Sequence, residues 1–147
     1  MGWTNSHLHH SVFEDRYYSE PGEFESPNNI DYSKVKLSDL ISSIEQKLEY
    51  EYDFGDGWEH EILLEKIIND YDSKHPVCLT GKRACPPEDC GGPYGYEDML
   101  KIMADPGHEQ YEEYVEWLDG EVFDPEYLDI DEINEMLKED DYGCLIY

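Results

Sequence analysis

Two stretches near the middle of the chain alternate between apolar and acidic residues. Residues 48–54 place leucine, tyrosine and phenylalanine against acids, and residues 58–64 resume the pattern from Trp58. A period of two is typical of a half-buried β-strand. Gly55 and Gly57, on either side of Asp56, accept positive φ angles at little cost, as a tight reversal requires. The sequence therefore predicts a β-hairpin over residues 48–64.

The pattern of the remaining residues predicts strands first and helices later. Residues 7–13 suit a short strand with His7 and His9 on one face, and the turn-rich residues 19–32 predict a long surface loop. Helical spacing of apolar residues predicts helices at 37–44, 96–103, 111–118 and 130–137, with Asp129 and Glu132 as a capping box and Asp124-Pro125 as a further helix start.

This order of elements predicts an α+β fold in a single domain covering residues 1–147. We expect a small antiparallel or mixed sheet with a central hairpin, packed by the C-terminal helices. At 147 residues the chain has the length of one ordinary domain.

Composition adds a strong negative charge to this picture. Hydrophobic residues make up 39% of the chain and aromatic residues 14%, which is too apolar for a disordered protein, yet the formal net charge is −27. Such a field repels nucleic-acid phosphates, so direct nucleic-acid binding is not expected. The acidic surface is open to several interpretations: a solvated surface, adaptation to salt, a protein partner with a basic face, or a DNA mimic.

The cysteines and the N-terminus both bear on the compartment. No segment approaches a membrane span and the first residues lack signal-peptide features, so we expect a cytoplasmic protein and no membrane association. The four cysteines are then reduced. Gaps of six and four residues between Cys78, Cys85 and Cys90 argue against structural zinc with His60 or His75. We expect Cys78 in the core on a strand, Cys85 packed under a loop, and no cofactor.

Histidines and aspartates cluster around the predicted hairpin. His7 and His9 share a strand face, while Asp53, Asp56 and His60 lie around the turn. If the two strands adjoin, these side chains can converge on a divalent metal or serve acid/base chemistry. The competing interpretation is that the aspartates bond the turn backbone and the histidines bond their neighbours. No catalytic residue and no metal ligand are therefore assigned.

A glycine- and proline-rich loop over residues 81–95 is the second candidate region. Lys82 lies in it with Glu88 and Asp89, which can assist the hairpin cluster. The loop lacks the P-loop pattern, and Lys82 with Arg83 is expected to pair with acids. We expect any function to reside in this loop and in the hairpin tip, where Trp58 follows the turn.

Three stretches together resemble one family, the plasmid pRiA4b ORF-three-like proteins. They are MGWTNSHLHHSVF, YEYDFGDGWEHEILLEK, and CLTGKRACPPEDCGGPYGYEDML followed by WLDGEVFDPEYLDIDEINEML. The resemblance implies an α+β fold in a biochemically uncharacterised family found on plasmids, insertion elements and chromosomes. Some relatives carry a resolvase-like name, for which this chain shows no basic arm or helix-turn-helix pattern. The family domain usually begins with a strand and helix ahead of Met1, so the chain is expected to be N-terminally short, with an exposed sheet edge.

Three hypotheses for function follow. The first is a non-enzymatic acidic domain that binds a protein partner with a basic face. The second is a metal-dependent or acid/base enzyme at the hairpin turn. The third is a DNA mimic or an antagonist of a basic protein.

Overall fold

The chain divides into two compact units. The computed structural model describes residues 2–22, 28–140 and 142. Residues 7–72 form one unit, which we call the sheet unit, and the other described residues form the helical unit. Strands precede the long helices, so the predicted α+β class is confirmed.

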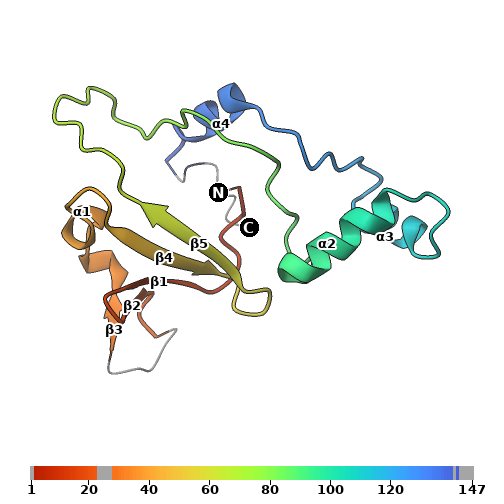
Figure 1. Ribbon diagram of the computed structural model, residues 1–147, viewed down its shortest axis with the longest axis horizontal. Coiled ribbons are helices and arrows are strands. Elements are labelled where there is room, and N and C mark those ends of the chain that lie inside the picture. The colour runs from red at the N-terminus through yellow and green to blue at the C-terminus, as the bar shows by residue number, and fades with distance from the viewer. Residues whose placement is uncertain (1, 23–27, 141, 143–147) are drawn as a thin grey trace. The chain divides into compact units, whose positions relative to one another are not determined.

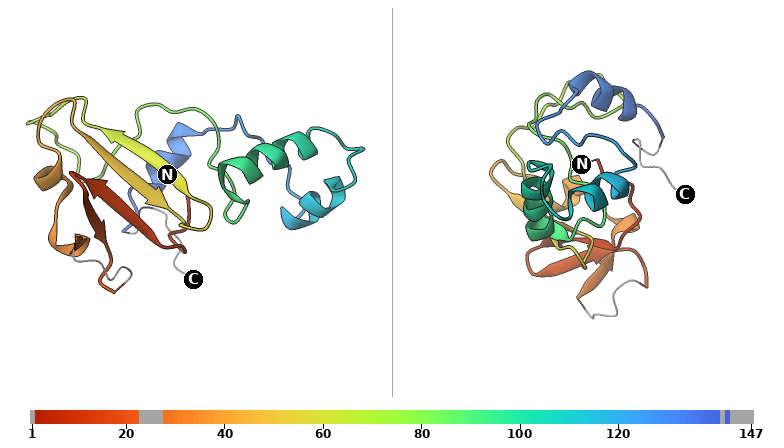
Figure 2. Two further views of the ribbon diagram at one scale, coloured as in Figure 1. Left: turned by 60° about the horizontal axis from the view of Figure 1, so that its bottom comes forward. Right: turned by 90° about the vertical axis from the view of Figure 1, so that its right-hand side faces the viewer.

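The described part of the sheet unit contains five strands joined in one mixed sheet (Figure 1). They are β1 (His9–Phe13), β2 (Arg16–Ser19), β3 (Asn29–Asp31), β4 (Lys47–Tyr52) and β5 (Trp58–Leu63). Their order is β3-β2-β1-β4-β5; β2 and β3 run parallel, and the other neighbours are antiparallel. Figure 2 shows β4 between β1 and β5. The predicted hairpin is thus confirmed as β4 and β5, and the first predicted strand as β1.

Strand register gives the sheet one aromatic face. His9 lies opposite Tyr52, which lies opposite Trp58 on the other side of β4. Tyr52 is 2% exposed, and Leu48, four residues earlier on the same face of β4, is 3% exposed. Side chains alternate between the faces of a strand, so the opposite face receives the acids. These are Glu49, Glu51, Glu59 and Glu61.

The loop predicted at residues 19–32 is wrong at both of its ends. Ser19 is the last residue of β2, and residues 29–31 form β3. Ser19 is fully buried and exchanges side-chain hydrogen bonds with Asn29 across the two strands. Residues 23–27, also within the predicted loop, lie outside the described residues. Ser19 and Asn29 thus join β2 to β3, because each side chain supplies a hydrogen-bond partner for the other.

The predicted helix at residues 37–44 is only one turn long. It follows a 3-10 turn, η1 (Tyr32–Lys34), and is present as α1 (Leu37–Leu40). Ile41 has extended backbone angles and is 5% exposed. Burial of Ile41 in the sheet unit takes the place of a second helical turn.

Three helices lie in the helical unit: α2 (Gly92–Met103), α3 (Tyr111–Trp117) and α4 (Ile130–Met136). The helix predicted at 96–103 is present as α2, in which Met99 and Ile102 are buried. Asp129 caps α4 by accepting the N–H groups of Asp131 and Glu132 at 3.0 Å.

The helix start predicted at Asp124-Pro125 is wrong. Asp124 instead accepts the N–H of Glu126 with its carboxylate at 2.9 Å, and its carbonyl accepts the N–H of Tyr127. The same residue types that open a helix also close an isolated turn, because both need an acceptor for exposed N–H groups.

Side chains tie the irregular segments of the helical unit together. The Asn134 amide donates to the Cys78 carbonyl at 3.0 Å and accepts the Cys78 N–H at 2.8 Å, as a paired strand would. Cys78 lies in no strand and is only half-buried, so its prediction as a core strand residue is wrong. Among the described residues, no helix combines the length and apolarity that crossing a bilayer demands.

Candidate functional site

The hairpin turn is organised by Asp53. Its φ of 55° is left-handed, a conformation that aspartate tolerates better than most residues. Oδ1 accepts the Gly55 N–H at 2.9 Å and the Asp56 N–H at 3.4 Å, and the Asp53 carbonyl accepts the Gly57 N–H at 2.6 Å. One carboxylate oxygen is therefore committed to the turn, and the carboxylate is held in a fixed place.

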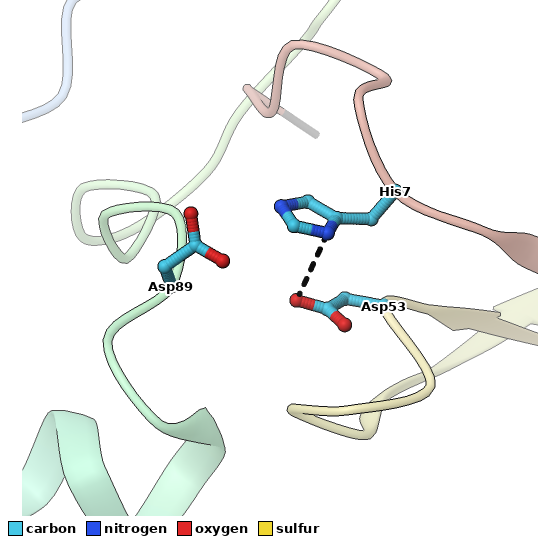
Figure 3. A group of neighbouring side chains, drawn as sticks. All are labelled: His7, Asp53 and Asp89. Atoms are coloured by element: carbon cyan, nitrogen blue, oxygen red, sulfur yellow. Dashed lines mark ion pairs between the residues drawn. The ribbon is translucent and has the colours of Figure 1, made fainter.

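The second carboxylate oxygen of Asp53 faces His7. The Nδ1 atom of His7 lies 3.5 Å from Asp53 Oδ2, and the side chains are 27% and 11% exposed respectively (Figure 3). The two segments are also joined by a hydrogen bond from the Asp53 N–H to the Leu8 carbonyl, and the His7 ring stands edge-on to Tyr52. A carboxylate at Nδ1 orients an imidazole and makes Nε2 the nitrogen that takes up a proton or a metal.

The other two histidines of the predicted cluster lie against tyrosine rings of the aromatic face. The His9 ring lies 5.8 Å from both Tyr32 and Tyr50, measured between ring centroids. His60 Nδ1 lies 3.1 Å from the Tyr50 carbonyl oxygen, and its ring is 5.6 Å from the Tyr50 ring. Strand β4 separates the strands that carry His9 and His60. The structure thus brings His7 and Asp53 together, while His9 and His60 each lie against tyrosines.

Trp58 and Asp56 complete the hairpin. Trp58 begins β5 opposite Tyr52, where it extends the aromatic face. Asp56 is half-buried in the turn, and its N–H faces the Asp53 carboxylate. Both residues are accordingly placed where they shape the turn that presents Asp53.

His10 is a buried histidine that sequence reasoning did not single out. It is 7% exposed, its Nε2 lies 3.3 Å from Glu51 Oε2, and its ring packs against Tyr17 and Phe54. His10 and Glu51 are register partners on the face opposite His9. Since the residues of a strand alternate between faces, the adjacent histidines of β1 necessarily enter different surroundings.

The loop candidates lie in the helical unit, where each has a distinct environment. Glu88 Oε1 accepts the Thr4 N–H at 2.8 Å and the Thr4 hydroxyl at 2.9 Å, which anchors the N-terminal segment. Arg83 pairs with Glu126 at 3.0 Å, while Lys82 is exposed. Asp89 is exposed and has a φ of 56°. Glu88 therefore has a structural role in this loop.

The described cysteines, Cys78, Cys85 and Cys90, lie in the helical unit. Burial raises the pKa of the Cys85 thiol to about 11, so it remains protonated at neutral pH. A methyl group on Gly2 would come within 2.8 Å of the Cys85 side chain, so this glycine allows close packing there. Cys90 is 7% exposed, and Cys144 lies outside the described residues.

A hollow in the helical unit is a further site that sequence reasoning missed. It has a volume of about 290 Å³ and is lined by Asp89, Cys90, Gln110, Glu113, Tyr114 and Trp117. Four of these follow the helical spacing i, i+3, i+4 and i+7 from Gln110. That spacing was a usable signal, but Gln110 and Glu113 are polar, so the four residues do not resemble a core face.

The fold and its candidate sites define a class of protein: a small, acidic α+β protein with a mixed sheet unit, a helical unit and a histidine–aspartate pair at its hairpin turn. The chain belongs to the plasmid pRiA4b ORF-3-like protein family, whose model matches residues 1–132. The resemblance noted from the sequence is thereby confirmed.

Two relatives are similar to this chain over most of its length. The chain is 36% identical over 140 residues to the uncharacterized protein y4hQ of Sinorhizobium fredii (strain NBRC 101917 / NGR234), covering 95% of this chain and 72% of the relative. It is also similar to the crystal structure of a protein of unknown function, MM3350, from Methanosarcina mazei Go1. The TM-score is 0.76 at 37% identity, over 88% of this chain and 74% of that one.

Proposed function

We propose that this chain is a non-enzymatic binding domain that recognises a basic region of a protein partner through the carboxylates of its helical unit. One observation carries this proposal. Between residues 84 and 140 there are nineteen acidic residues and two basic ones, and all of the acids except the half-buried Glu88 are exposed.

The two cations of this stretch are already matched locally. Lys101 lies 3.0 Å from Asp98 within α2, and Lys138, two residues after the end of α4, lies 2.6 Å from Glu135. Most of the negative charge is therefore turned toward solvent without a nearby lysine or arginine. A field of one sign steers an oppositely charged partner and raises its association rate.

The charge also favours one class of partner over another. Nucleic-acid affinity depends largely on cations that contact phosphates, and this surface presents carboxylates instead. A basic protein segment supplies the complementary charge. The proposal thus keeps the basic-faced protein partner expected from composition and locates its docking surface on the helical unit.

Two triple variants with the same change in charge test this proposal. The helical variant carries Glu112→Gln, Glu116→Gln and Glu121→Gln; the sheet variant carries Glu49→Gln, Glu59→Gln and Glu65→Gln. All six glutamates are exposed. At about twofold per surface charge, the helical variant should bind an arginine-rich peptide roughly eightfold more weakly, and the sheet variant less than threefold. Equal losses in calorimetric titration would mean that only net charge matters and would refute the proposal.

We propose as a second candidate that His7 takes part in metal binding or proton transfer, because a fixed carboxylate lies 3.5 Å from its Nδ1 atom. Elemental analysis of the purified chain, with thermal melts with and without a chelator, tests the metal form of this idea. His7→Gln should remove bound metal and the chelator effect together, whereas His9→Gln should retain both. Retention of the metal in His7→Gln would contradict it.

A further inference from the structure

We infer that the hollow beside α3 receives one cationic side chain, an arginine or a lysine, from the protein partner. This inference rests on the proposed binding function and adds the chemistry of the contact. The hollow is lined by Asp89, Cys90, Gln110, Glu113, Tyr114 and Trp117, so two carboxylates and two aromatic rings share one cavity and no lysine, arginine or histidine lines it.

Of these two carboxylates and two rings, helix α3 carries three, namely Glu113, Tyr114 and Trp117. Glu113 and Trp117 are four residues apart and lie on the same face of the helix, and Tyr114 lies one turn before Trp117. The rings of Tyr114 and Trp117 stand at 88° with centroids 6.1 Å apart, so they form a corner of the hollow. Trp117 remains 42% exposed, which leaves indole surface within reach of a ligand.

The combination of groups selects an organic cation. Aromatic rings attract a cation within about 6 Å of the ring centroid, most strongly for tryptophan. Carboxylates accept hydrogen bonds from the N–H groups of guanidinium or ammonium. A calcium ion would need about six to eight oxygen ligands, more than Asp89, Glu113 and Gln110 provide as single side chains.

The hollow is large enough to admit a single side chain. Its volume of about 290 Å³ lies at the lower end of the range of about 300–1,000 Å³ that is typical of ligand sites. Glu112 and Glu116 lie on the same helix and are exposed, but they do not line the hollow. They therefore supply long-range attraction, while Glu113 supplies the contact.

Glu113→Gln and Glu112→Gln form a matched pair for the test. Each removes one charge from α3, and only the first changes the hollow. The probe is a short, capped peptide with two arginines separated by glycine and serine, titrated calorimetrically into the full chain. We expect about tenfold weaker binding for Glu113→Gln and about twofold for Glu112→Gln. Trp117→Leu, which keeps apolar bulk, should also weaken binding about fivefold.

The outcomes separate the two proposals. Equal, small losses in Glu113→Gln and Glu112→Gln would overturn the hollow as the contact site while leaving the acidic binding surface in place. No binding of the peptide to the unmodified chain, even at low salt, would overturn both. A citrulline version of the peptide that binds as tightly as the arginine version would show that the hollow takes a neutral ligand and would overturn the inference. Circular dichroism melts of each variant confirm that the fold is retained.

Discussion

Replacement of Asp53 separates its role in the hairpin turn from its charge beside His7. Asp53→Ala removes the acceptor for the Gly55 N–H and places a residue that disfavours φ of 55° at that position. Asp53→Asn retains a side-chain oxygen and tolerates the left-handed backbone, but it removes the negative charge. The two variants thus differ in turn geometry while both lose the ion pair.

The expected changes in the free energy of unfolding follow from the contacts that Asp53 makes. The hydrogen bond at 2.9 Å to a charged acceptor contributes about 1.5–3 kcal/mol, and the bond at 3.4 Å to the Asp56 N–H adds little. A left-handed alanine costs about 1–2 kcal/mol. With partial compensation by water at this turn, Asp53→Ala should lower the free energy of unfolding by about 2–4 kcal/mol. Asp53→Asn should lower it by about 1 kcal/mol or less, because His7 is 27% exposed and the pair is partly screened.

Urea unfolding followed by circular dichroism measures these differences, and His7→Gln completes a double-mutant cycle with Asp53→Asn. The coupling energy between the two side chains should be about 0.5–1 kcal/mol. If Asp53→Asn destabilises the chain as much as Asp53→Ala, the charge outweighs the turn geometry and the reasoning is refuted. A coupling energy of zero would remove His7 as a partner of Asp53 in solution.

Three further substitutions test the helical unit. Gly95→Ala should destabilise the chain by about 1–3 kcal/mol in urea unfolding, because a methyl group there would overlap the Cys90 carbonyl; a change below about 0.5 kcal/mol would contradict that packing. Asn134→Ala should cost about 1–3 kcal/mol in the same assay, since it leaves the N–H and carbonyl of Cys78 without their amide partner. The raised pKa of Cys85, about 11 against 9.0 ordinarily, means that the folded state holds a proton which the unfolded state releases as pH passes 9.0. Its contribution is therefore present below pH 9.0 and is lost as pH rises toward about 11, so the melting temperature should fall more steeply there in the unmodified chain than in Cys85→Ser.

The hairpin and the faces of β1 could be predicted because their signal is local. Alternation over residues 48–52 and 58–63 fixes which side chains share a face, whatever their neighbours are. Strands β2 and β3 were missed since each is only three or four residues long and they pair in parallel although nine residues separate them in the sequence. Their connection through Ser19 and Asn29 is a long-range event that no periodicity reports.

In the helical unit, too, local patterns could be predicted from the sequence and long-range packing could not. The apolar spacing at residues 96–103 predicted α2 itself, but the end of α1 at Leu40 and the turn at Asp124 depended on packing and on competing hydrogen bonds. In α3 the hollow is lined by a helical face that includes Gln110 and Glu113, and a polar helical face normally indicates solvent. Asp89 and Cys90 of the loop also line the hollow, and helical spacing does not report their position.

The histidine–aspartate pair depends on one backbone conformation. Strict alternation along β4 would place Asp53 with Glu49 and Glu51 on the acidic face, away from Tyr52. The left-handed φ at Asp53 ends the strand, so its carboxylate faces a histidine whose ring lies against Tyr52. The sequence shows histidines and aspartates near the turn. The geometry that joins His7 to Asp53 arises where the alternation breaks. His9 and His60, which lie on regular strands, remain against tyrosines. The pair is thus a product of the turn, which is why substitutions that preserve or abolish the turn are the ones that test it.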